Sequence, residues 1–104
     1  MIPASVRVFV CAEPQDMRRS FDALALAAQQ HLGEDPQTGA VFVFCNKRCD
    51  RLKALWFDRN GYCILYKRLH RARFELPEHR TIEPRMLAVI LRGVDSARRD
   101  SLRD

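Results

Sequence analysis

The sequence predicts a single α+β domain, in which a small antiparallel β-meander carries two main helices packed on one face. Apolar residues recur at helical spacing near the N-terminus and again near the C-terminus. Three strand-like runs joined by turn residues lie between these two segments. A length of 104 residues and a hydrophobic fraction of 47% suit one domain with a modest core.

The N-terminal segment predicts a strand followed by a helix. Residues 6–10 read VRVFV, a run of β-branched and aromatic side chains that is typical of a strand. Asp16 is then expected to cap a helix over residues 17–32, because its carboxylate can accept from free backbone N–H groups. Gly33 is expected to end this helix in the left-handed conformation. The apolar stripe consists of Met17, Phe21, Leu24, Ala28 and Leu32.

The middle of the chain predicts the β-meander, over residues 40–69. Asn60-Gly61 separates two hydrophobic runs and is a strong signal for a hairpin. A short continuation of the meander is expected over residues 73–76, ending at Pro77. The three runs of the meander are residues 40–44, 51–58 and 62–69.

The C-terminal part predicts a second helix over residues 84–93. Pro84 suits a first helical turn, and apolar residues then recur on one face up to Val94. We expect residues 1–95 to form the domain and the charged segment 96–104 to be a disordered tail.

Positive charge is concentrated in the predicted meander. The chain has 18 Lys and Arg against 13 Asp and Glu, a net charge of +5. Between Asn46 and Arg73 there are nine basic and two acidic residues, so this span carries +7 and the rest of the chain −2. A concentration of this kind favours an anionic partner, because cations that neutralise phosphates release condensed counterions.

Strand geometry predicts how these cations are arranged. Arg51 and Lys53 share one face of their strand, and a hairpin at Asn60-Gly61 places them opposite residues 67–69. We therefore expect Arg51, Lys53, Lys67 and Arg68 to form one positive surface at the far end of the hairpin. A solvated edge protected by charge is the alternative interpretation.

The predicted nucleic-acid-binding residues extend beyond these four. Arg18 and Arg19 are included because cations are mildly unfavourable in a first helical turn, where a partner phosphate or carboxylate would stabilise them. A solvated turn explains them equally well. The complete predicted set is Lys47, Arg48, Arg51, Lys53, Lys67, Arg68, Arg71 and Arg73, together with Arg18 and Arg19.

Aromatic side chains alternate with these cations and could stack on bases. Strand aromatics at this density more often form the core of a small domain. We expect Phe42, Phe44 and Phe57 to be core residues, and leave Trp56 and Tyr66 open between the two roles.

The chain contains no recognisable catalytic or metal-binding motif. Cys45 and Cys49 form a CxxxC whose intervening Lys47 and Arg48 would repel a metal cation, so we predict free thiols, no metal and no cofactor. None of the three histidines has a Cys or Ser in an activating arrangement, and we expect no enzymatic activity. With no signal-peptide pattern and no long apolar stretch, we expect a cytoplasmic protein without a membrane or small-molecule partner.

Several segments, taken in order, resemble a known family, the TnpB-type accessory proteins of the sixty-six family of bacterial insertion sequences. The DMRR-F segment and the DR-K-LW-D-G segment are specific in combination. The matching segments are Ile2-Pro3, residues 6–9, 16–24, 41–44 and 50–58 with Gly61, residues 66–69 and 73–74, and residues 82–95. Family members often have Gly at the position of Ala72.

The resemblance implies a protein that is encoded beside a separate transposase and supports transposition without catalysing it. Two functions then remain open. The protein could bind DNA through its basic meander, or it could dock on the transposase or another accessory subunit of the same element. A DNA-binding protein needs its cations on one contiguous face, whereas a docking module should expose an apolar patch.

Overall fold

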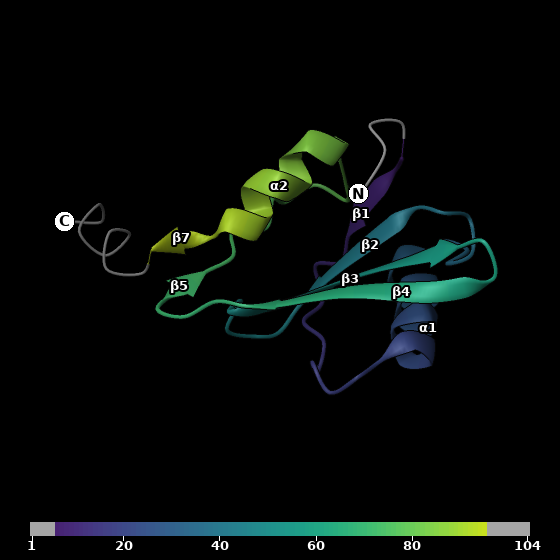
Figure 1. Cartoon of the computed structure of the whole chain (residues 1–104), viewed down its shortest axis with the longest axis horizontal. Helices are drawn as coiled ribbons and strands as arrows, with labels where there is room; N and C mark the ends of the chain where they lie inside the picture. The colour runs from purple at the N-terminus through teal and green to yellow at the C-terminus, as the bar shows by residue number, and fades with distance from the viewer. Residues whose placement is uncertain (1–5, 96–104) are drawn as a thin grey trace.

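A computed structural model describes residues 6–95 and confirms the α+β fold class (Figure 1). The expected tail, residues 96–104, lies outside the described residues. The main sheet has five strands, which are β1 (Val8–Val10), β2 (Val41–Cys45), β3 (Arg51–Asp58), β4 (Gly61–Arg68) and β6 (Thr81–Ile82). Their order in the sheet is β4-β3-β2-β1-β6.

The predicted meander is present as the antiparallel strands β2, β3 and β4. The strand expected near the N-terminus is also present, and β1 pairs in parallel with β2. Parallel neighbours need a crossover connection, and helix α1 (Phe21–Leu32) provides it. The sheet is therefore mixed, with β1 between β2 and the short antiparallel strand β6.

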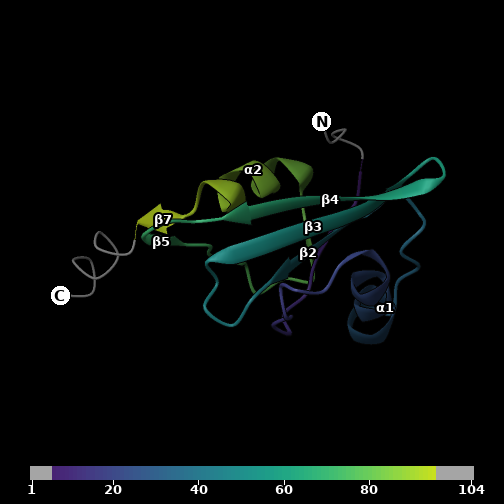
Figure 2. The ribbon, with the colours of Figure 1, turned by 60° about the horizontal axis from the view of Figure 1, so that its bottom comes forward.

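The two helices cover opposite faces of the sheet, which corrects the expectation that both pack on one face. Helix α1 packs on the face that carries Phe9, Phe42 and Leu55. Helix α2 (Pro84–Arg92) packs on the other face, against residues such as Val8 and Val43, and Figure 2 shows the sheet between the helices. Every residue of β1 and β2 is buried, and a strand that is apolar on both faces needs cover on both sides.

Helix α1 begins four residues later than predicted, so the expectation that Asp16 caps it is wrong. Ser20 occupies the N-cap position, and the helix starts at Phe21. The Asp16 carboxylate instead accepts from the backbone N–H of Arg18 at 2.9 Å, which closes a local turn and competes with helix formation. The predicted end is confirmed: Gly33 has a φ of 66° and its N–H points back to the last turn.

The β3–β4 hairpin is confirmed, with its turn one residue earlier than expected. Asp58 pairs with Gly61, so Arg59 and Asn60 form the turn, and Arg59 takes the positive φ of 58°. The shift changes the partner of each residue by two positions, which preserves the face on which every side chain lies. Arg51 lies directly opposite Arg68.

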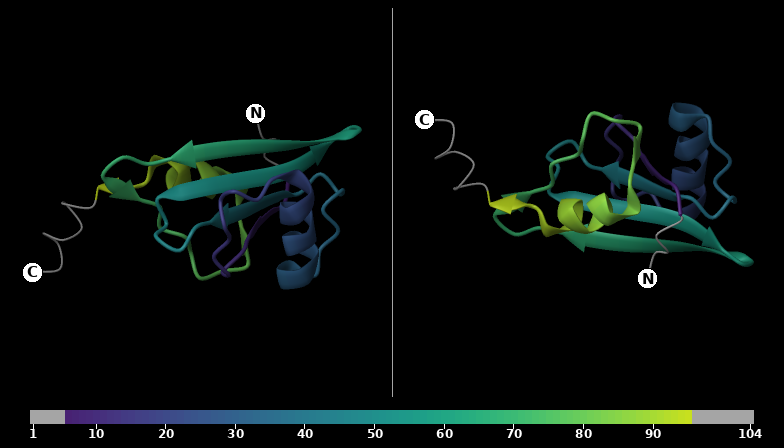
Figure 3. Two further views of the ribbon diagram at one scale, coloured as in Figure 1. Left: turned by 90° about the horizontal axis from the view of Figure 1, so that it is seen from below. Right: turned by 90° about the horizontal axis from the view of Figure 1, so that it is seen from above.

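The expected continuation of the meander at residues 73–76 is wrong. After β4, Arg71 adopts a φ of 59° and the chain leaves the sheet. Strand β5 (Ala72–Arg73) then pairs with β7 (Val94–Asp95) in a separate two-stranded ribbon. Both views in Figure 3 place this ribbon at one end of the molecule, beyond the end of β4.

Gly93, between α2 and β7, is predicted to be intolerant of a side chain. Its φ of 73° and ψ of 176° lie in a region that essentially only glycine occupies. A Cβ atom there would lie 2.5 Å from Leu69 Cδ1 and 3.2 Å from the Arg73 carbonyl oxygen. We expect Gly93→Ala to lower the free energy of unfolding by about 1–3 kcal/mol in urea denaturation.

The matched control is Gly39→Ala. Gly39 also has a positive φ, of 91°, but a Cβ atom added there would meet nothing within 4 Å. A smaller loss for Gly39→Ala separates steric overlap from backbone strain. Equal losses in the two variants would contradict the close packing of Gly93 on Leu69.

Candidate nucleic-acid interface

The turn between β2 and β3 carries two of the predicted cations, and the side chain of Asn46 organises it. The Asn46 Oδ1 atom accepts from the backbone N–H groups of Asp50 at 3.1 Å and Arg51 at 3.0 Å. Its Nδ2 atom donates to Asp50 Oδ1 at 2.6 Å, and this hydrogen bond lowers the pKa of the Asp50 carboxyl. The turn therefore has a defined shape, from which Lys47 and Arg48 extend into solvent.

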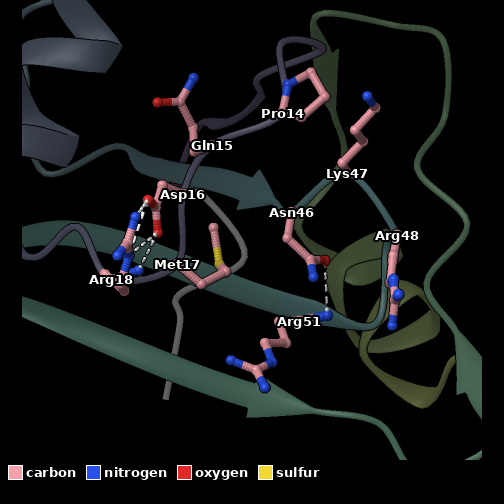
Figure 4. A pocket seen from close by; sticks show the side chains of 9 residues that line it. All are labelled: Pro14, Gln15, Asp16, Met17, Arg18, Asn46, Lys47, Arg48 and Arg51. Atoms are coloured by element: carbon pink, nitrogen blue, oxygen red, sulfur yellow. Dashed lines mark hydrogen bonds and ion pairs between the residues drawn. The ribbon is translucent and has the colours of Figure 1, made fainter.

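A second loop faces this turn across an open hollow of about 590 Å³ (Figure 4). The backbone N–H of Gln15 donates to the Cys45 carbonyl at 2.8 Å, which holds the loop on the end of β2. Arg18 lies on the loop side of the hollow and forms an ion pair with Asp16 at 2.6 Å. The lining residues are Pro14, Gln15, Asp16, Met17, Arg18, Asn46, Lys47, Arg48 and Arg51.

The start of β3 and the end of β4 add a directly opposed pair of arginines. Arg51 and Arg68 are cross-strand partners, so their side chains leave the same face of the sheet. Arg68 is exposed and Arg51 is half-buried. Within residues 6–95, no ion pair joins either guanidinium to a carboxylate. Like charges placed directly opposite one another destabilise a sheet.

Arg71 and Arg73 extend this positive surface around the end of the molecule. Both are exposed and line a second hollow, of about 330 Å³, together with Asp50, Leu69 and Ala72. Arg48 lines both hollows and so connects them. We call the combined surface the cationic end. It consists of Arg18, Lys47, Arg48, Arg51, Arg68, Arg71 and Arg73.

Lys53 and Lys67 do not belong to this surface, which corrects the expectation of one continuous patch with Arg51 and Arg68. Lys53 is only 7% exposed; its Nζ donates to the Arg19 carbonyl oxygen at 2.6 Å and lies 4.8 Å from the Tyr66 ring centre. Lys67 lies on the opposite face, because successive strand residues alternate, and its Nζ donates to the Leu91 carbonyl oxygen at 2.8 Å. The two ammonium groups therefore connect the sheet to other parts of the fold: Lys53 to the loop before α1, and Lys67 to the end of α2.

Arg18 and Arg19 both precede the first turn of α1, so the expectation that they lie in that turn, unfavourably placed in the helix dipole, is wrong. Arg18 remains at the cationic end but is bound to Asp16. Arg19 donates from Nη1 to Gln15 Oε1 at 3.1 Å, and its carbonyl holds Lys53. Arg19 therefore helps to attach the loop to the sheet.

The aromatic residues divide between the core and the surface. Phe42 and Phe44 are fully buried, as expected. Phe57 is only half-buried, because it lies near the hairpin turn, where it contacts Tyr62 edge-on. Trp56 is half-buried on the α2 face. Tyr66 is 49% exposed and lies next to the cationic end.

The thiols are free: Cys11 and Cys45 are buried, and Cys49 and Cys63 are partly buried. Burial raises the pKa of the Cys45 thiol. Among residues 6–95, no three His, Cys, Asp or Glu side chains gather in a way that could hold a metal ion. That part of the chain also contains no helix with the length and hydrophobicity to cross a membrane.

Comparison with known proteins identifies the family of this chain. The model of the family described as IS66 Orf2 like protein matches residues 6–101. The chain belongs to this family. It is therefore an accessory protein of IS66-type insertion sequences, in agreement with the resemblance of its motifs.

Two relatives from Sinorhizobium fredii cover nearly the whole chain. Uncharacterized protein y4hO is 38% identical in an alignment of 101 residues that covers 91% of this chain and 88% of the relative. Uncharacterized protein y4jC is 31% identical in an alignment of 97 residues that covers 89% of this chain and 83% of the relative. No solved structure matches the chain.

Sequence reasoning missed Asn46 and Gln15, the two uncharged residues that shape the site of this family member. Asn46 follows a strand and precedes a polar segment ending in Asp50, a pattern that indicates a side-chain-stabilised turn. The contact of Gln15 with the end of β2 joins segments 30 residues apart, and no local signal in the sequence indicates it.

The ion pair at the cationic end is expected to govern the titration of Asp16. The hydrogen bond from the Arg18 guanidinium lowers the pKa of Asp16 from 3.8 to about 2. A lowered pKa means that the pair stabilises the folded chain above the ordinary pKa, and that this contribution is lost as the pH falls towards 2. NMR titration of the Asp16 carboxyl should give a pKa near 2, and Arg18→Ala should return it towards 3.8. A normal pKa in the unchanged chain would show that Arg18 is free in solution.

The opposed arginines are expected to reduce stability. Arg68→Glu replaces repulsion of Arg51 by attraction, so we expect it to raise the free energy of unfolding by up to about 1 kcal/mol. Denaturation at low salt measures the gain, which should shrink at high salt because Arg68 is exposed and salt screens its interaction with Arg51. Arg7→Glu is the control, since Arg7 is exposed, precedes β1 and changes the net charge equally. An equal gain in both variants would attribute the effect to net charge alone.

Proposed function

We propose that this accessory protein supports transposition by binding DNA phosphates with its cationic end and has no catalytic activity of its own. The observation that carries the proposal is the Arg51–Arg68 pair, which stands directly opposed and forms no ion pair with a carboxylate among the described residues. Such a pair is unfavourable in the free protein and is stabilised when a polyanion neutralises it.

The surroundings of the pair support a phosphate-binding role. Lys47, Arg48, Arg71 and Arg73 are exposed around it. Two carboxylates line the hollows. Asp16 is paired with Arg18. Asp50 keeps its negative charge, and its pKa is lowered by the hydrogen bond from Asn46 and further by the nearby charges of Arg51 and Arg48. The seven cations of the cationic end outnumber these two carboxylates by five, so a net positive charge remains to attract a ligand. Contacts to the DNA backbone fix position and affinity without reading bases, so we expect low sequence specificity.

A second candidate function is docking on the transposase or another accessory protein of the same element. Exposed apolar residues on α2 favour this alternative. Met86 is 39% exposed, and together with Val89 and Leu76 it lines a hollow of about 280 Å³. The hollow lies on the α2 side of the sheet, so docking there and DNA binding at the cationic end do not exclude one another.

The DNA-binding proposal is tested by fluorescence anisotropy with labelled duplex DNA over a series of salt concentrations. Arg51→Ala with Arg68→Ala removes two phosphate-binding cations. We expect the variant to bind more weakly to every sequence, with the log–log salt slope flattened by up to about 2 units, since each neutralised phosphate contributes about 0.9.

The matched control removes two cations elsewhere, as Arg7→Ala with Arg85→Ala. Arg7 precedes β1 and Arg85 is in the first turn of α2, so neither lies at the cationic end. The control should keep nearly the full affinity and slope. If both double variants lose the same affinity for DNA, the loss is caused by net charge and not by the cationic end. If the variant without Arg51 and Arg68 binds DNA as well as the unchanged chain, DNA binding at this site is rejected.

A further inference from the structure

The longest exposed backbone edge of the molecule is strand β4. It is the terminal strand of the sheet, pairs with β3 along all eight of its residues, and has no other strand beside it among residues 6–95 (Figure 1). The opposite edge strand, β6, has only two residues. Strand β4 contains no proline, and its ladder with β3 runs from residue 61 to 68 without a bulge. An uninterrupted edge of this length is a template for pairing with another strand.

The register shows which backbone groups of β4 face outward. The Leu69 N–H donates to the Asp50 carbonyl oxygen at 2.8 Å, so the odd-numbered residues at this end direct their N–H and C=O groups towards β3. On the other side of β3, the Asn46 N–H donates to the Arg51 carbonyl oxygen, which fits the same alternation. The outward-facing backbone groups are therefore those of Tyr62, Ile64, Tyr66 and Arg68.

The side chains of β4 are self-complementary in an antiparallel arrangement centred on Leu65. A two-fold axis through a sheet keeps each face continuous, so it pairs residues whose numbers are both even or both odd. In the register centred on Leu65, this residue meets its own symmetry mate and Ile64 meets Tyr66. Tyr62 then lies opposite Arg68, an arrangement that permits cation–π contact. No two cations are opposed, whereas parallel pairing in register would place Lys67 and Arg68 against their own copies.

Exposure is concentrated where this arrangement would bury side chains. Leu65 is 36% exposed and Tyr66 is 49% exposed, although both lie within a regular strand. No acidic residue is present in β4 to oppose pairing. The charge of the strand is confined to its last two residues, at the end away from the hairpin turn.

We propose that two copies of this chain form a symmetric dimer by antiparallel pairing of their β4 edges, with Leu65 on the two-fold axis. The dimer joins two five-stranded sheets into one continuous sheet. The two Arg68 residues are then separated by six strand positions, or roughly 20 Å along the strands. The two cationic ends therefore point in opposite directions from the axis. The dimer proposal does not depend on the DNA-binding proposal, because it is tested in the absence of DNA.

The test is analytical ultracentrifugation of the full chain over a concentration series reaching about 100 µM, without DNA. We expect a mass that rises from the monomer value of 12.1 kDa towards twice that value. Leu65→Lys and Leu65→Glu should each be monomeric, because two like charges would meet on the axis. A mixture of the two variants should restore a dimer containing one copy of each, since the charges then attract.

Recovery of the dimer in the mixture is expected only if residue 65 of one copy lies opposite residue 65 of the other copy. Leu26→Lys is the matched control, because Leu26 is also an exposed leucine, at 50%, but lies on α1; it should dimerise like the unchanged chain. Circular dichroism verifies that each variant is folded. The proposal is overturned by a folded unchanged chain that stays monomeric throughout the series, by variants that still dimerise alone, or by a mixture that stays monomeric.

Discussion

Burial of β2 on both of its faces is the constraint on which the rest of the structure depends. Its five residues, VFVFC, leave no side that can face water. One layer must therefore cover Phe42 and Phe44, and another must cover Val41 and Val43. Helix α1 and helix α2 supply these layers, and the parallel pairing of β1 with β2 follows from the crossover that α1 makes. Because both faces of the central strands are covered, binding surfaces can form only at the ends of these strands and along the free edge of the sheet.

The cationic end lies at one of these strand ends, where β2 leaves the core and enters a turn. The loop of residues 14–18 reaches the same point because β1 runs parallel to β2, so both strands end on the same side of the sheet. Asn46 and Gln15 then hold the turn and the loop in place with uncharged hydrogen bonds. Apart from Arg18, which is bound to Asp16, the arginines of the cationic end form no ion pair among the described residues, so this end keeps a net positive charge that can attract a partner.

The lysines of the same segment show that tertiary packing decides whether a cation is available for binding or has a structural role. Lys53 and Lys67 contribute to the positive charge of the span as much as Arg51 and Arg68 do. Yet each lysine directs its single ammonium group to a backbone carbonyl, and Lys53 extends beneath the loop that contains Arg19. A lysine can cover apolar surface with its stem while its ammonium bonds a carbonyl, so it serves the fold at these positions.

The amino-acid sequence by itself determined the two helices, the first strand, the three-stranded meander and the segment that carries the positive charge of this protein. Periodicity marked both helices, Asn60-Gly61 marked the hairpin, and the hairpin register placed Arg51 opposite the basic end of β4. These features depend on interactions between residues that are near in sequence or related by one turn. Only the tertiary structure decided that the helices lie on opposite faces, that Lys53 is buried while Arg48 joins two hollows, and that the β4 edge is free. Those outcomes depend on how segments distant in the chain pack together, and local pattern does not encode which distant surface covers which residue.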